Sequence, residues 1–225
     1  MATTTAGFEE GRQRMVEHQL AARGIDDPLV LAAMGKVPRE KFVSAGQARL
    51  AYRDGALPIG EGQTISQPYI VARMTAALRL VPTDRVLEIG TGSGYAAAVL
   101  AEIAAEVYTV ERLPRLAEGA RQRLTELGYL NVHVLTGDGT LGWPEHAPYD
   151  AIVATAGGPR APHALLDQLA IGGRLVIPLG ADLYEQRLVR IVRLNAQDYE
   201  RESLEAVAFV PLIGAEGWPA GVSGS

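Results

Sequence analysis

The chain has 225 residues, of which 48% are hydrophobic and 21% are charged, and this composition fits one globular domain. The net charge of -5 and the scattered Lys and Arg argue against a nucleic-acid partner, and the lack of cysteine excludes disulfides, thiolate metal sites and a thiol nucleophile. No apolar stretch approaches about 18 residues and no basic-then-apolar leader is visible. We therefore expect a soluble, cytoplasmic protein with no membrane partner.

Residues 1–80 are predicted to form a cap of helices and loops. Apolar residues recur at helical spacing around Met15 and Val30, and the sequence DDP at 26–28 is typical of a helix start. Residues 52–67 contain three glycines and a proline, which predicts a loop. Helical spacing returns over residues 69–80.

Strands and helices alternate in the α/β core that we expect over residues 81–214. Apolar runs predict strands at 86–89, 107–110, 132–135, 151–154 and 174–177, with helices at 95–103, 113–127 and 164–169. This alternation predicts a doubly wound, mostly parallel sheet with helices on both faces. Later apolar runs at 188–192 and 207–210 are expected to pair antiparallel, and residues 215–225 are expected to be a flexible tail.

A glycine-rich turn follows the predicted strand 86–89. Gly90, Gly92 and Gly94 precede a helical stretch. Glycine lets a ligand approach the main chain closely, and the helix N-terminus beyond it favours negative charge. A dinucleotide site has the spacing G-x-G-x-x-G, whereas the third glycine here comes one residue early. Alone, the motif is also compatible with a tight strand-to-helix turn.

Carboxylates follow the next two predicted strands. Glu111 ends the strand 107–110, about 20 residues after the turn, where an acid accepts hydrogen bonds from ribose hydroxyls in nucleotide-binding folds. Asp138 lies between two glycines after the strand 132–135, where it either forms a turn or accepts a hydrogen bond from the adenine amine. The three features together predict a nucleotide-cofactor site at the carboxyl edge of the sheet.

Two motifs resemble known families. The G-x-G-x-G spacing preceded by Glu88 resembles the first motif of class I S-adenosylmethionine-dependent methyltransferases, which have a Rossmann-like fold. The more specific sequence GQTISQP at 62–68, with VPREKF at 37–42 and FVPL at 209–212, closely resembles protein-L-isoaspartate O-methyltransferases over nearly the whole chain. The resemblance implies methyl transfer from S-adenosylmethionine to the free carboxylate of isoaspartyl residues in damaged proteins or peptides. The ester then closes to a succinimide, whose hydrolysis restores some normal aspartate.

The resemblance implies that Ser66 is the active-site residue, although Ser66 and Thr64 without it would only be expected to cap the helix near Pro68. The acceptor carboxylate is ionised at neutral pH, so Ser66 is expected to orient it as a hydrogen-bond donor rather than to act as a nucleophile. The four histidines lack metal-ligand spacing, so no metal is expected. The resemblance and the glycine turn together give the expected cofactor contacts: Thr64, Tyr69, Glu88, Gly90, Gly92, Ser93, Glu111, Asp138 and Gly139.

One departure from the family leaves the acceptor open. Residues 155–162 read TAGGPRAP, where the family usually has a more apolar turn rich in Ala and Pro. Added glycine flexibility and the cation of Arg160 leave room for a related activity, methylation of an ordinary Asp in a ribosomally made peptide to drive aspartimide formation. A non-catalytic module that senses the cofactor is a further alternative, against which the Ser66 loop argues. The main expectation is a monomeric repair enzyme.

Overall fold

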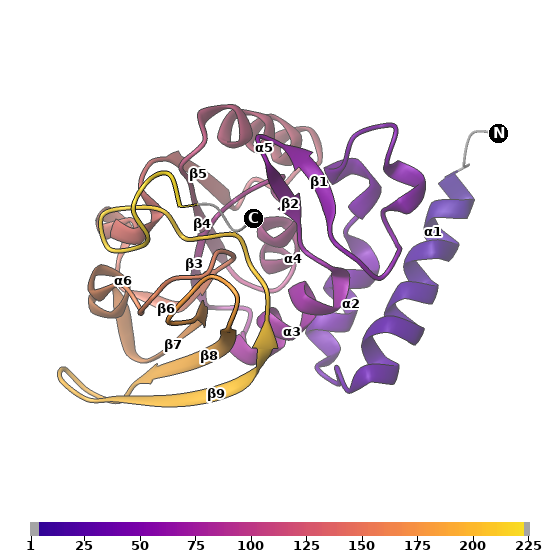
Figure 1. Cartoon of the computed structure of the whole chain (residues 1–225). Coiled ribbons are helices and arrows are strands. Elements are labelled where there is room, and N and C mark those ends of the chain that lie inside the picture. The colour runs from indigo at the N-terminus through magenta and orange to yellow at the C-terminus, as the bar shows by residue number, and fades with distance from the viewer. Residues whose placement is uncertain (1–4, 223–225) are drawn as a thin grey trace.

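The computed structural model describes residues 5–222 and is built around a seven-stranded sheet with the order β5-β4-β3-β6-β7-β8-β9 (Figure 1). Five strands are parallel: β3 (Arg85–Ile89), β4 (Glu106–Glu111), β5 (Val132–Thr136), β6 (Tyr149–Ala154) and β7 (Leu169–Leu179). The last two, β8 (Gln186–Arg193) and β9 (Tyr199–Val207), each pair antiparallel with the strand before them. The predicted mostly parallel sheet with antiparallel C-terminal strands is confirmed.

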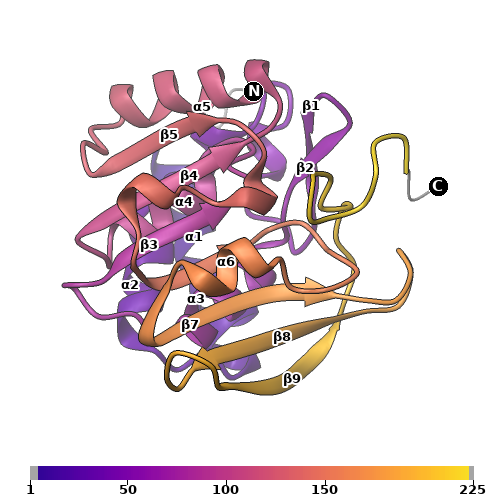
Figure 2. The ribbon, with the colours of Figure 1, turned by 90° about the vertical axis from the view of Figure 1, so that its left-hand side faces the viewer.

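Both faces of the sheet are buried. Val86 belongs to a core shared with the N-terminal helices, whereas its neighbour Leu87 belongs to a second core that includes Leu165. In a strand with one exposed face, apolar and polar residues alternate. These strands are buried on both faces, which explains why their sequences are apolar throughout. Figure 2 shows α6 in front of the strands and α3 and α4 behind them. The helices on the sheet are α3 (Pro68–Leu78), α4 (Tyr95–Ala101), α5 (Pro114–Glu126) and α6 (His163–Asp167).

The N-terminal cap adds α1 (Thr5–Arg14) and α2 (Pro28–Lys36) to the face that carries α3 and α4. The predicted helix start is confirmed, because the Asp27 carboxylate accepts hydrogen bonds from the Leu29 and Val30 backbone nitrogens at 2.9 and 3.3 Å and Pro28 is the first helical residue. Between α1 and α2 the chain continues through a π-helical turn (Met15–Leu20) and a 3-10 turn (Ala21–Arg23).

Two elements differ from the prediction. A hairpin of β1 (Leu57–Gly60) and β2 (Gln63–Ile65) occupies the predicted loop, since its strands are short and its turn needs positive φ at residues 60–62. A strand was expected at 207–210, but the last strand, β9, runs from Tyr199 to Val207 instead. This edge strand pairs on one side only and is rich in charge, which blunts an exposed edge and removes the apolar signal.

The C-terminal segment runs back to the carboxyl edge of the sheet. The Leu212 nitrogen donates to the Gly157 carbonyl at 2.8 Å, and the Ala215 nitrogen donates to Asp138 Oδ2 at 2.7 Å. The Trp218 indole donates to the same Gly157 carbonyl at 3.0 Å. Hydrogen bonds to the rest of the protein therefore extend into the predicted tail, residues 215–225, at least as far as Trp218. Residues 223–225 lie outside the described part of the chain.

Candidate active site

Three cavities meet at the carboxyl edge of the parallel strands. An inner cavity of about 510 Å³ lies against α3 and α4, and an outer cavity of about 590 Å³ lies at the ends of β3 and β4. A groove of about 1380 Å³ borders residues 206–211. Thr64 and Thr155 line all three. A small molecule in the inner and outer cavities would therefore meet a larger ligand in the groove at these two threonines.

The turn from β3 to α4 lines both cavities through Gly90 and Gly92, and Ser93 adds to the inner one. The φ angles of Gly90 and Gly92 are 93° and 53°, which side chains rarely adopt. A Cβ at Gly90 would lie 2.4 Å from Thr155 Oγ1, and that hydroxyl donates to the Gly90 carbonyl at 2.7 Å. Glycine is therefore required here by the backbone conformation and by the approach of Thr155, and the predicted approach of a ligand to the main chain stays a prediction.

Glu111 ends β4 and lines the outer cavity. Its Oε2 accepts from the Gly92 nitrogen and its Oε1 from the Leu113 nitrogen, each at 2.9 Å. Two backbone donors therefore fix the carboxylate, and each oxygen keeps a lone pair for a ligand hydroxyl. Apolar side chains of Val110, Leu113 and Ile213 stand around it. An acid beside apolar walls suits the ribose and base of a nucleoside.

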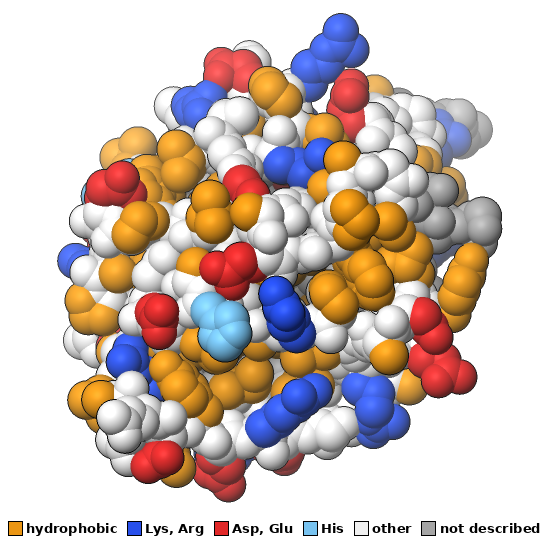
Figure 3. Space-filling view, turned by 60° about the vertical axis from the view of Figure 1, so that its left-hand side comes forward, with side chains coloured by type: hydrophobic (Ala, Val, Ile, Leu, Met, Phe, Trp, Pro, Cys, Tyr) orange, Lys and Arg blue, Asp and Glu red, His pale blue; other side chains and the backbone are white. Residues whose placement is uncertain are grey.

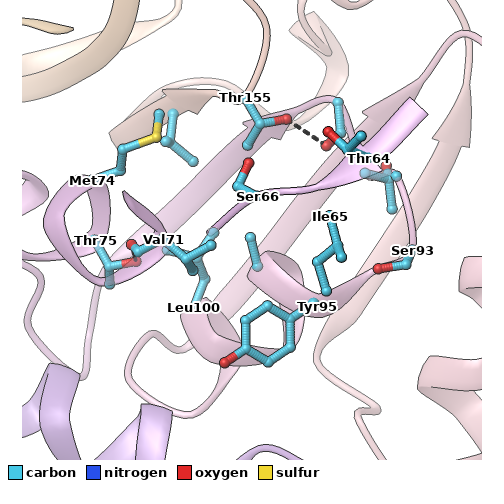
Figure 4. A pocket seen from close by; sticks show the side chains of 15 residues that line it. Thr64, Ile65, Ser66, Val71, Met74, Thr75, Ser93, Tyr95, Leu100 and Thr155 are labelled. Carbon is cyan, nitrogen blue, oxygen red and sulfur yellow. Dashed lines mark hydrogen bonds between the residues drawn. The ribbon is translucent and has the colours of Figure 1, made fainter. Parts of the chain in front are cut away.

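Ser66 follows the β1–β2 hairpin and lines both the inner cavity and the groove. Ile59 of the hairpin lies over the glycine turn, where a Cβ at Gly92 would approach its Cδ1 to 3.2 Å. In Figure 4 the Ser66 hydroxyl points toward Thr155, and within residues 5–222 it makes no hydrogen bond. Ser66 thus presents a free donor at the boundary between the cavities and the groove.

Glu88 is fully buried beneath the turn and lines none of these three cavities. Thr109 Oγ1 donates to its Oε2 at 2.6 Å and lies 2.6 Å from Thr91 Oγ1, which ties the acid to the glycine turn. In the described part of the chain Glu88 Oε1 has no partner. Loss of solvation raises the pKa of Glu88 to about 8, a shift that the Thr109 hydrogen bond opposes and the charge of Glu111 increases.

Two further predicted contacts, Asp138 and Tyr69, also lie outside the linings of the three cavities. Asp138 Oδ1 accepts from the nitrogen and hydroxyl of Thr140 at 2.9 and 2.7 Å, so it caps a turn and anchors residue 215. Its neighbour Gly139 does line the outer cavity. The Tyr69 ring faces Arg23, whose guanidinium carbon is 3.6 Å from the ring centroid. All the predicted cofactor contacts stay predictions, and the cavity linings give no support to those of Tyr69, Glu88 and Asp138.

Other lining residues were not predicted. Thr155 immediately follows β6, and its position at the carboxyl end of a central parallel strand is the signal that could have identified it. Residues 210–213 close the outer cavity from the C-terminal segment. The motif FVPL at 209–212 carried part of the resemblance but was not assigned to the site, because these residues reach it through long-range pairing with Gly157.

A parallel sheet, a glycine turn over cavities at its carboxyl edge and an acid at the end of the next strand define a Rossmann-like methyltransferase. The family model described as protein-L-isoaspartate(D-aspartate) O-methyltransferase matches residues 10–217. The chain belongs to this family. Membership confirms the predicted enzyme class, an O-methyltransferase of isoaspartyl residues that uses S-adenosylmethionine.

Similar proteins and solved structures support this family membership. Protein-L-isoaspartate O-methyltransferase 2 of Pelobacter propionicus is 65% identical over 210 residues, which are 93% of each chain. Protein-L-isoaspartate O-methyltransferase 1 of Geotalea uraniireducens is 64% identical over 207 residues, covering 92% of this chain and 94% of that one. A solved protein-L-isoaspartate O-methyltransferase has a TM-score of 0.84 at 30% identity, covering 92% of this chain and 67% of that one. A putative one from Plasmodium falciparum, in complex with S-adenosyl-L-homocysteine, has a TM-score of 0.76 at 27% identity and 90% and 98% coverage.

Proposed function

We propose that the two cavities bind S-adenosylmethionine, that the groove binds the isoaspartyl segment of a damaged protein or peptide, and that Ser66 orients the acceptor carboxylate between them. The observation that carries this proposal is the free hydroxyl of Ser66, which lines both the inner cavity and the groove. The outer cavity fits the nucleoside, because Glu111 offers acceptors to ribose hydroxyls and apolar side chains face the base.

The bound donor supplies an electrophilic methyl group on its sulfonium. The acceptor carboxylate is ionised at neutral pH, since such groups titrate near pH 3.3 to 3.9. No histidine lines the three cavities, and none is needed because no proton has to be removed. The protein has to orient the two reactants, and orientation lowers the activation free energy by about 7 to 11 kcal/mol in well-aligned reactions. Ser66 holds one carboxylate oxygen, and the glycine turn fixes the other reactant.

Of the turn at residues 155–162, only Thr155 and Ala156 line the three cavities, whereas its glycines and Arg160 do not. Gly157 and Gly158 are buried and held by backbone hydrogen bonds, with the Gly157 nitrogen donating to the Val210 carbonyl at 2.8 Å and the Gly158 nitrogen to the Pro178 carbonyl at 3.0 Å. Arg160 is exposed and absent from the linings of the three cavities. The geometry therefore gives no support to the alternative based on flexibility and a cation at this turn.

Paired peptides that differ only in Asp or isoAsp at one position test the acceptor. With labelled S-adenosylmethionine, we expect methylation of the isoAsp member alone. Methylation of the Asp member alone would replace repair by peptide tailoring. Tight binding of the donor with no turnover of either peptide would instead indicate a cofactor sensor.

The cytoplasmic location, the monomeric state and the absence of a nucleic-acid partner stay proposals. Figure 3 supports the last, because basic, acidic and hydrophobic side chains are interspersed on the face it shows. In residues 5–222 no helix is both long enough and apolar enough to span a bilayer. Sedimentation at several protein concentrations tests the monomer, which should show one species of about 24 kDa.

A further inference from the structure

Arg39 is a charged side chain in an unusual place. It has 0% exposure, and within the described part of the chain it forms no ion pair. Its sequence neighbour Glu40 is engaged elsewhere, by Arg12 at 3.6 Å and by the Tyr52 hydroxyl. The Nη1 of Arg39 also has no hydrogen-bond partner among residues 5–222. Burying a cation without a counter-ion is costly, so this arginine needs an explanation beyond packing.

The two carbonyls that Arg39 holds bracket the β1–β2 hairpin. Its Nε donates to the carbonyl of Ala51 at 2.7 Å, and its Nη2 donates to the carbonyl of Ser66 at 2.7 Å. Because the planar guanidinium has fixed donor directions, these two bonds fix the position of residue 66 relative to residue 51, on the two sides of the hairpin. A lysine carries its three N–H donors on a single nitrogen, so it cannot reproduce the fixed separation between Nε and Nη2 that these two bonds use.

The same guanidinium faces the helix that follows the glycine turn. Its central carbon lies 4.7 Å from the ring centroid of Tyr95, the first residue of α4. Tyr95 is fully buried, lines the inner cavity and packs edge-on against Phe42 with ring centroids 5.5 Å apart. Arg39 therefore contacts both the residue that carries the candidate hydroxyl and the first residue after the turn under the cavities.

We propose that Arg39 is a positioning residue for methyl transfer: it sets the place of the Ser66 hydroxyl relative to the donor by bonding to the Ser66 carbonyl while it rests on Tyr95. The inference rests on the proposed role of Ser66. Arg39 acts through the backbone of residue 66, so it keeps its contact when the Ser66 hydroxyl is removed. Once the hydroxyl is gone, a shift of residue 66 can no longer affect methyl transfer, and this property makes the inference testable.

The test is a double-mutant cycle of Arg39→Lys and Ser66→Ala, with turnover of an isoAsp peptide at saturating donor and the dissociation constant of S-adenosylhomocysteine as readouts. We expect Arg39→Lys alone to lower kcat/KM about 10- to 100-fold, the scale of a misplacement near 1 Å. In the Ser66→Ala background the same change should alter kcat/KM by no more than about twofold. S-adenosylhomocysteine affinity should stay within about twofold in every variant.

Arg174→Lys is the matched control. Arg174 also donates to backbone carbonyls, those of Leu78 at 2.6 Å, Arg79 at 2.8 Å and Asp150 at 3.1 Å. It lies near the opposite end of the strands, beside Asp84. It should lower stability without changing kcat/KM. If Arg39→Lys does not fold, Arg39→Gln takes its place in the cycle.

The outcomes separate the two ideas. An equal loss from the Arg39 change with and without the Ser66 hydroxyl, or a matching loss of S-adenosylhomocysteine affinity, overturns the role of Arg39 and leaves that of Ser66. Full activity of Ser66→Ala overturns the role of Ser66, and that of Arg39 with it.

Discussion

The carboxylate of Glu111 is hydrogen-bonded directly to the glycine turn, with 2.9 Å between its Oε2 and the backbone nitrogen of Gly92. The acid at the end of β4 and the turn after β3 are therefore one unit. A change at Glu111 alters the ligand contact and the backbone beneath the ligand together.

Glu111→Gln should weaken S-adenosylhomocysteine binding. The amide nitrogen of glutamine cannot accept the hydrogen bond that one carboxylate oxygen receives, and bonds to a charged group contribute about 1.5 to 3 kcal/mol, or roughly 10- to 100-fold in affinity. Titration calorimetry measures the change. Glu106→Gln, at the other end of the same strand, is the control and should bind normally. Unaltered affinity in Glu111→Gln would remove Glu111 from the donor site.

Ser66→Ala should reduce turnover and spare donor binding. Loss of one orienting donor is expected to lower kcat/KM for an isoAsp peptide about 100-fold, while S-adenosylhomocysteine affinity stays within about twofold. Steady-state kinetics and calorimetry on the same preparation give both values. Ser203→Ala removes a hydroxyl that binds Arg187 on the β8–β9 pair and serves as control. Equal losses in both measurements would assign Ser66 to the cofactor instead.

Asp138→Ala should lower stability as well as donor affinity. Its carboxylate accepts from the buried Thr140 and from Ala215, so its removal frees a buried donor and releases the segment that carries Ile213 into the outer cavity. We expect a loss of about 1 to 3 kcal/mol in the free energy of unfolding, measured in urea. A variant with full stability but weak donor binding would favour direct contact of Asp138 with adenine.

Glu88 should make stability depend on pH. Its pKa rises from 4.5 to about 8 on folding, so between these values the folded state binds more protons than the unfolded state. The free energy of unfolding should therefore fall as pH rises from about 5 to about 8, by up to about 1.4 kcal/mol per pH unit. In Glu88→Gln this contribution disappears, so the free energy of unfolding should change less steeply with pH.

The control for Glu88 is Glu126→Gln, an exposed glutamate on α5, which should keep the wild-type slope. Urea titrations at several pH values give the comparison. A wild-type slope in Glu88→Gln would show that Glu88 is ionised throughout.

The sequence predicted the parts of the site that depend on local chemistry. Apolar strands buried on both faces and the glycine turn were recognisable, because burial and positive φ restrict residue types directly. The β1–β2 hairpin and the edge strand β9 were not recognisable. Pro58 and the glycines of the hairpin are typical of loops, and the many charged residues of β9 hide its apolar pattern. The location of Ser66 was predicted by resemblance, whereas its support by Arg39 needed the folded chain: residues 39, 51 and 66 form no local pattern.

The wall of the outer cavity joins Thr64 to Ile213, so its assembly spans most of the polypeptide. During synthesis on the ribosome, the growing chain cannot complete this wall until residue 213 has left the exit tunnel. Any stabilisation by a bound donor that requires this wall is therefore absent from every shorter nascent chain, and these intermediates depend more on the cores of the sheet.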